Sequence, residues 1–195
     1  MVDFNKIIGI DDCFEAPNKI METLFNKEAR EKMFTALLKA NNYNVDEDFF
    51  LKYFEEEYAE RKSKKQLFTP PSISKLTALL VNSDKGNYFE CCCGTGSMLI
   101  AHWATLRKKF SPLDYKPSYH FATVEELSDR TIPFLLTNMM IRGMNGVVIH
   151  GDSLTRKCKD IYYVFNENDD HLQFSNIIKL PHVEKVEKEF NIFFK

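Results

Sequence analysis

The strongest constraint on the fold lies in residues 87–100, whose sequence is NYFECCCGTGSMLI. This pattern predicts a short buried strand that ends near the acid Glu90, a turn bracketed by Gly94 and Gly96, and the first turn of an apolar helix. Glycine lets the backbone turn sharply and approach a ligand closely, and the following helix directs free N–H groups and the positive end of its dipole toward that ligand. An acid beside such a turn suits a ligand with hydroxyl groups or a cationic end. The segment therefore favours a cofactor such as S-adenosylmethionine.

The rest of the chain combines a helical region with alternating strands and helices. Apolar residues recur at helical spacing in residues 1–62, where Asp46 is the expected cap of a second helix. Beyond this region the pattern predicts helices over 72–82, 96–110 and 128–142, and strands over 88–92, 120–125, 146–150 and 160–165. Such alternation is typical of a parallel, doubly wound sheet. We predict an N-terminal helical region (1–62), a Rossmann-like α/β domain (63–165) and a tail (166–195) that covers the sheet edge or docks a partner.

Acids follow three successive predicted strands. They are Glu90, the pair Glu125-Glu126, and Asp152. Because sheets of this kind bind ligands at the carboxyl ends of their strands, these acids should lie around one ligand. A single acid there could merely cap the following helix, but three acids beside a glycine turn favour a nucleoside-type cofactor.

The cysteine content and the lengths of the apolar runs indicate the cellular compartment. Five cysteines, three of them consecutive, do not form a disulfide framework and suit a reducing cytoplasm. Adjacent strand residues point to opposite faces, so Cys91–Cys93 cannot converge on one zinc, and we expect no metal. No apolar run approaches the ~20 residues of a membrane span, and the N-terminus has no signal-peptide core. We therefore expect a cytoplasmic protein without a membrane segment.

The net charge of the chain does not favour binding to nucleic acid in general. The net charge is −2, so any contact with phosphate would depend on local basic runs. Two such runs exist, over residues 61–65 and 107–109. Runs of this kind are more often solvated loops or helix ends.

Four motifs in order resemble those of the N-6 adenine-specific DNA methyltransferases, especially the modification subunits of type I restriction systems. They are QLFTPP (66–71), ECCCGTG (90–96), ELS (126–128), and TNMMIRG (137–143) followed by GDSL (151–154). Their family counterparts are QFFTPP, DPACGSG, E-[LI]-N, and MNLxxHG followed by GD[TS]L. The resemblance implies a Rossmann-like methyltransferase fold, S-adenosylmethionine as cofactor, and methyl transfer to adenine in DNA.

The resemblance also implies a set of cofactor-binding residues. They are Thr69, Pro70, Glu90, Gly94, Thr95, Gly96, Glu126 and Asp152. Thr69 and Pro70 would lie over the methionine end of the cofactor, Glu126 would accept the ribose hydroxyls, and Asp152 would accept the adenine amine. The chemistry agrees, because an ionised carboxylate accepts hydrogen bonds from paired donors. The chain departs from the family in having Glu90 for Asp, Cys91 for Pro, and Ser128-Asp129 for Asn-Pro.

One family motif is missing. The family grips a flipped adenine with [ND]-P-P-[FY] at the end of a fourth strand, where two oxygens accept from the target amine and the ring stacks on the base. Here the strand expected over 160–165 is followed by Asn166 without either proline, so Asn166 is the one catalytic candidate. The chain after Leu154 is also too short to complete a sheet of the family's usual size.

The sequence leaves three functions open. The first is methyl transfer to adenine in DNA, with a protein subunit that completes the sheet or supplies target recognition. The second is a catalytically deficient S-adenosylmethionine-binding regulatory protein. The third is a decoy or interaction protein of a restriction-modification or mobile-element system.

Overall fold

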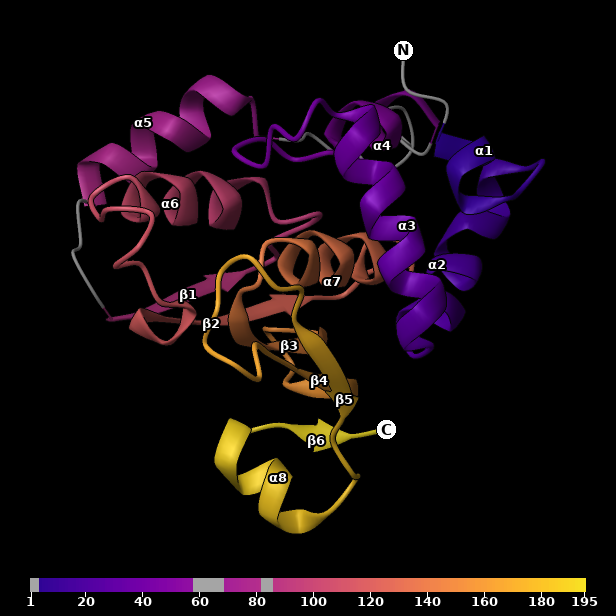
Figure 1. Cartoon of the computed structure of the whole chain (residues 1–195). Coiled ribbons are helices and arrows are strands. Elements are labelled where there is room, and N and C mark those ends of the chain that lie inside the picture. Colours follow the sequence, from indigo (N-terminus) through magenta and orange to yellow (C-terminus); the bar gives the residue numbers. More distant parts are fainter. Residues whose placement is uncertain (1–3, 58–68, 82–85) are drawn as a thin grey trace.

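The computed structural model describes residues 4–57, 69–81 and 86–195, and shows helices packed on a mixed β-sheet (Figure 1). The helices are α1 (Phe4–Ile8), α2 (Ala16–Leu24), α3 (Lys27–Ala40), α4 (Leu51–Glu57), α5 (Pro71–Val81), α6 (Ser97–Arg107), α7 (Ile132–Ile141) and α8 (Glu184–Phe190). The strands are β1 (Gly86–Cys91), β2 (His120–Glu126), β3 (Asn145–Gly151), β4 (Lys157–Phe165), β5 (Asn176–Lys179) and β6 (Phe193–Phe194). The predicted α/β fold class is confirmed. The start of the first motif (66–68), the basic run 61–65 and the boundary between residues 62 and 63 lie outside the described residues.

The sheet has the strand order β1-β2-β3-β4-β5, and β6 pairs with β4. Strands β1, β2 and β3 are parallel, because α6 and α7 each return the chain across the sheet before the next strand begins. Cys91 lies opposite Glu125, and Glu126 lies opposite His150. The carboxyl ends of the three strands therefore share one edge of the sheet, which we call the carboxyl rim.

Strand β4 departs from the parallel pattern. It pairs antiparallel with β3, with Gly146 opposite Val164 and His150 opposite Asp160. The cause is the short connection over 152–156, because a parallel crossover needs a dozen or more residues. The predicted strand over 160–165 is confirmed, but the parallel direction expected for it is wrong, because it starts at the carboxyl rim and ends at the opposite end of the sheet.

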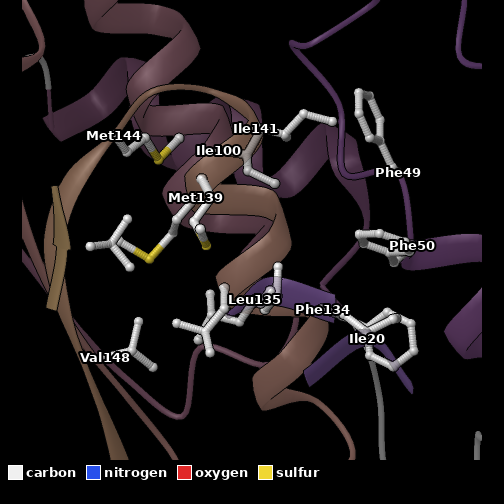
Figure 2. Packing of buried hydrophobic residues seen from close by; sticks show 14 of the residues in the cluster. Ile20, Phe49, Phe50, Ile100, Phe134, Leu135, Met139, Ile141, Met144 and Val148 are labelled. Atoms are coloured by element: carbon white, nitrogen blue, oxygen red, sulfur yellow. The ribbon is translucent and has the colours of Figure 1, made fainter. Parts of the chain in front are cut away.

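Helix α7 forms the centre of the core. All its residues are buried, as expected for a mostly apolar helix, and its two polar residues Thr137 and Asn138 are hydrogen-bonded. Leu135 and Met139 lie on the side of β3, where Val148 is, whereas Phe134 lies on the other side near Phe50 (Figure 2). The ring centroids of Phe134 and Phe50 are 5.0 Å apart. The N-terminal helices therefore cover the outer face of α7.

The tail lies on the β4 side of the sheet. Strand β5 pairs antiparallel with β4, on the side of β4 that faces away from β3. Strand β6 pairs with the start of β4. Ile192, which precedes β6, is 2% exposed and belongs to a small second cluster with Ile149 and Ile161. Figure 1 shows α8 at this end of the molecule, away from the other helices.

Strand β1 is the other outer strand of the sheet. Within the described part of the chain it pairs only with β2, and Phe89 at its middle is 64% exposed. Helix α5, which packs on α6, exposes several apolar side chains as well. No other described strand pairs with the outer side of β1, and the prediction that this strand is buried is wrong, because most of its residues are exposed.

Candidate functional site

The glycine turn joins β1 to α6 at the carboxyl rim. Cys92, Gly94 and Gly96 have positive φ angles of 60°, 60° and 91°. A Cβ on Gly96 would lie 2.9 Å from Cδ1 of Leu135, so the packing of the turn on α7 requires glycine. A Cβ on Gly94 would meet no atom within 4 Å. Among the described residues, nothing therefore occupies the space next to the Cα of Gly94, where a ligand can approach the backbone.

Glu126 joins the end of β2 to this turn. Its Oε2 accepts a hydrogen bond from the backbone N–H of Gly94 at 2.8 Å, and its Oε1 accepts one from Ser128 at 2.8 Å. An ionised carboxylate has about four acceptor positions, so about two remain after these bonds. Backbone groups thus hold the buried carboxylate of Glu126, and acceptor positions are left on its two oxygens.

Glu125, the other acid of the pair, has a structural partner. Both of its oxygens lie 2.9 Å from Nη1 of Arg156, and Arg156 also donates to the backbone carbonyls of Phe190 and Asn191. This contact fastens the C-terminal segment to β2. Consecutive residues of a strand point to opposite faces, which is why only one of the two acids reaches the glycine turn.

Asp152 begins the turn between β3 and β4 at the same rim. Its Oδ1 accepts hydrogen bonds from the N–H groups of Leu154 and Thr155 at 2.9 and 3.2 Å. Bonds from the Thr155 side chain and from these backbone groups hold the pKa of Asp152 below its usual range. The next residue, Ser153, has its Oγ 3.7 Å from Sγ of Cys92. The end of β3 therefore meets the glycine turn, as the end of β2 does.

Glu90 lies near the end of β1 with its carboxyl group half-buried. Its Oε2 accepts a hydrogen bond from the hydroxyl of Tyr88 at 2.8 Å. Burial raises the pKa of Glu90 to about 7; nearby Glu126 raises it as well, and the Tyr88 bond opposes the change. Glu90 is therefore close to half ionised at neutral pH.

This shifted pKa predicts a pH-dependent stability. Between pH 4.5, the ordinary pKa, and about 7, the folded protein holds a proton on Glu90 that the unfolded chain has lost. The free energy of unfolding therefore falls as pH rises through this window. Glu90→Gln should remove the fall and raise the free energy of unfolding at pH 8 by roughly 1–3 kcal/mol. Urea denaturation of the wild type and of Glu90→Gln at pH 5 and pH 8 measures these free energies of unfolding. An equal effect of the substitution at the two pH values would contradict the prediction.

Thr69 and Pro70 precede α5. The carbonyl of Pro70 accepts hydrogen bonds from the N–H groups of Ile73 and Ser74 at 2.9 and 3.1 Å, so this residue helps to start the helix. Helix α5 packs on α6, which begins at the glycine turn. No hydrogen bond recorded for the described residues joins Thr69 or Pro70 to that turn. Their place over a cofactor therefore stays a prediction.

Asn166 lies at the edge opposite the carboxyl rim, because it follows the antiparallel strand β4. The length of β2, roughly 20 Å, separates the two edges. The Nδ2 of Asn166 donates to the carbonyls of Asp170 and Gln173 at 2.8 and 3.1 Å, and its Oδ1 accepts from the N–H of Asp170 at 2.9 Å. These bonds stabilise the loop after β4. The expectation that Asn166 grips the target base is therefore corrected: its side chain holds its own loop, far from the glycine turn.

The basic run 107–109 at the end of α6 is partly neutralised. Arg107 and Lys108 pair with the two oxygens of Asp46 at 2.9 and 2.5 Å. The predicted capping role of Asp46 is wrong, because α4 begins only at Leu51 and the Oδ1 of Asp48 accepts the nearby N–H of Phe50. Asp46 instead ties the segment before α4 to the end of α6.

Sequence reasoning missed Asp48. Its carboxylate accepts hydrogen bonds from the hydroxyls of Thr95 and Ser97 at the glycine turn, although these residues are far apart in the chain. The one local signal was the position of Asp48 just before an aromatic run, where an acid can cap a helix. The sequence analysis assigned this capping role to Asp46. A contact of this kind is visible only in the folded chain.

The groups at the carboxyl rim suit a ligand with hydroxyl and amine groups. Glu126 retains acceptor capacity, Asp152 is ionised, and no described residue occupies the space next to the Cα of Gly94. The described residues include no group of three or more His, Cys, Asp or Glu side chains that could hold a metal ion. None of the helices in the described ranges is long and apolar enough to span a membrane.

Comparison with known proteins gives one family. The model of the family described as N-6 DNA Methylase matches residues 46–192, which is most of the chain. This region begins in the segment before α4 and includes the glycine turn, Glu126 and Asp152. A search of curated proteins found no match.

Proposed function

The chain belongs to the N-6 DNA methylase family, and from this premise we propose that it binds S-adenosylmethionine at the carboxyl rim. The observation that carries the proposal is the meeting of two strand ends at the glycine turn, through the bond from Gly94 to Glu126 and the contact of Cys92 with Ser153. In an open α/β sheet this is where ligands bind.

Each group at the rim has a role that fits its surroundings. Glu126 would accept the ribose hydroxyls with its remaining acceptor positions, and Asp152 would accept the adenine amine. The methionine end would lie toward Thr69 and Pro70. The site would be lined by Glu90, Gly94, Thr95 and Gly96. When bound, S-adenosylmethionine supplies an electrophilic methyl group.

The activity proposed for this site is methyl transfer to N6 of adenine in DNA, completed by a second polypeptide. The chain has no Asn-Pro-Pro or Asp-Pro-Pro sequence, and Asn166 lies at the wrong edge of the sheet. Among the described residues, however, no strand pairs with the outer side of β1, which ends at the glycine turn. A partner strand paired there would bring new side chains to the carboxyl rim, because an exposed edge accepts further strands. DNA as substrate and free cysteines both agree with a cytoplasmic protein.

The missing base-gripping motif favours a second function. A chain that binds the cofactor without transfer chemistry would act as a regulatory or decoy protein of a restriction-modification or mobile-element system. The two functions differ in whether methyl groups are transferred to DNA when DNA and a partner protein are added.

Two measurements test the proposal. Calorimetric titration of the chain with S-adenosylmethionine should show one binding site. Transfer of tritiated methyl groups to unmethylated DNA should be absent with the chain alone and appear when a candidate modification subunit is added. Lack of cofactor binding would overturn the proposal. Binding without transfer in either mixture would support the regulatory function.

A further inference from the structure

The segment between α3 and α4 lies against the glycine turn. Within it, Oδ2 of Asp48 accepts hydrogen bonds from the hydroxyls of Thr95 and Ser97 at 2.5 and 2.7 Å. Thr95 belongs to the turn and is 1% exposed, and Ser97 is the first residue of α6. One carboxylate oxygen therefore joins this segment both to the turn and to the helix that follows.

The other oxygen of Asp48 is fixed as well. Its Oδ1 accepts hydrogen bonds from the N–H of Phe50 at 2.9 Å and from Nδ2 of Asn138 at 2.8 Å. Asn138 is fully buried in α7, and its Nδ2 also donates to the carbonyl of Thr95 at 2.8 Å. Its side-chain oxygen accepts from Nη1 of Arg142 at 2.9 Å. Asp48 thus belongs to a connected network that holds the turn on α7.

Two carboxylates therefore hold consecutive residues of the turn. Glu126 accepts from the backbone of Gly94, and Asp48 accepts from the side chain of Thr95. Gly96, the N-cap residue of α6, makes no side-chain cap. The charge of Asp48 consequently lies at a helix end where the dipole favours an anion.

From these contacts we propose that Asp48 is a positioning residue, which holds the glycine turn in the conformation that binds the cofactor and does not itself touch the cofactor. Only the expected effect on affinity rests on the proposed function, because the effect on the turn needs no ligand. The segment that contains Asp48 lies at the start of the family match and outside the motifs recognised in the sequence.

Hydrogen exchange of the ligand-free protein tests the effect on the turn. Asp48→Asn keeps the shape of the side chain and removes its charge. The amides of Gly94 and Gly96 should then exchange about 10-fold faster than in the wild type. Asp46→Asn is the matched control, since Asp46 lies in the same segment but pairs with the other end of α6. Equal exchange at the turn in Asp48→Asn and wild type would overturn the proposal.

Calorimetric titration with S-adenosylmethionine measures the consequence for the site. Asp48→Asn and Thr95→Val should each weaken binding by roughly 10-fold, and the double variant should lose less than the sum of the two single losses, because both substitutions disrupt the contact between Asp48 and Thr95. Thr95→Ser keeps a hydroxyl that can donate to Asp48 and should bind more tightly than Thr95→Val, which has no donor. A role of Asp48 in stability alone predicts instead that affinity does not depend on the side chain at position 95 in variants that are folded.

The titrations are made at a temperature where circular dichroism shows every variant to be folded. Asp46→Asn should bind with wild-type affinity even where its stability falls. If the wild type itself fails to bind, the proposed function fails, and hydrogen exchange still decides whether Asp48 positions the turn. Wild-type affinity in Asp48→Asn, or additive losses in the double variant, would refute the positioning role.

Discussion

Replacing Arg142 by Met is expected to lower the free energy of unfolding by about 3–5 kcal/mol. The side chain is 2% exposed and donates to the carbonyls of Val45, Glu47 and Asn138, and to Oδ1 of Asn138. Its guanidinium also lies 4.7 Å from the ring centre of Phe49. Burial lowers the pKa of Arg142 to about 10, so the group stays charged at neutral pH. Met fills similar space but leaves several buried oxygens without a donor.

Urea denaturation at pH 7 measures this loss as a lower midpoint with an unchanged slope. Arg107→Met is the matched control, because Arg107 is partly exposed and its pair with Asp46 is expected to contribute only about 0–1 kcal/mol. A loss below about 1 kcal/mol for Arg142→Met would show that water replaces the missing donors. The network behind the glycine turn would then not depend on Arg142.

Replacing Glu126 by Ala is expected to weaken the binding of S-adenosylmethionine by roughly 10- to 200-fold, or about 1.5–3 kcal/mol. The substitution removes a buried carboxylate that would accept the ribose hydroxyls. It also removes the acceptor for the N–H of Gly94, so the turn loses one of its two carboxylate partners. Calorimetric titration at a temperature where both proteins are folded measures the change.

The neighbouring acid is the control for this prediction. Glu125→Ala breaks the contact with Arg156 and should lower stability, because it releases the C-terminal segment from β2. Its carboxylate does not contact the glycine turn, so the affinity for the cofactor should stay at the wild-type value. If Glu126→Ala also bound as tightly as the wild type, the assignment of the site to this rim would be wrong.

Much of the fold could be predicted from local patterns. The strand before the glycine turn, the helices on either side of β2 and the position of β3 follow from apolar periodicity and from turn residues. The direction of β4 could not be predicted in this way, since the same pattern fits a strand that runs either way. The wrong placement of Asn166 followed from this single ambiguity.

The candidate site, too, could be predicted only in part from local patterns. The pattern of acids at strand ends indicated both Glu125 and Glu126, but which of them reaches Gly94 depends on the register of β2 against its neighbours. Asp48 gave no usable signal, because its partners Thr95 and Asn138 come from distant parts of the chain. The raised pKa of Glu90 likewise depends on burial that no local pattern reveals.

The sequence by itself determined the α/β alternation, the glycine turn and the family, since these depend on backbone preferences and residue order within short segments. Only the tertiary structure decided the direction of β4, the separate partners of Glu125 and Glu126, the contact of Asp48 with the turn, and the outer position of β1 among the described strands. The physical reason is that strand pairing and burial depend on which surfaces exclude water together, and those surfaces come from residues far apart in the chain.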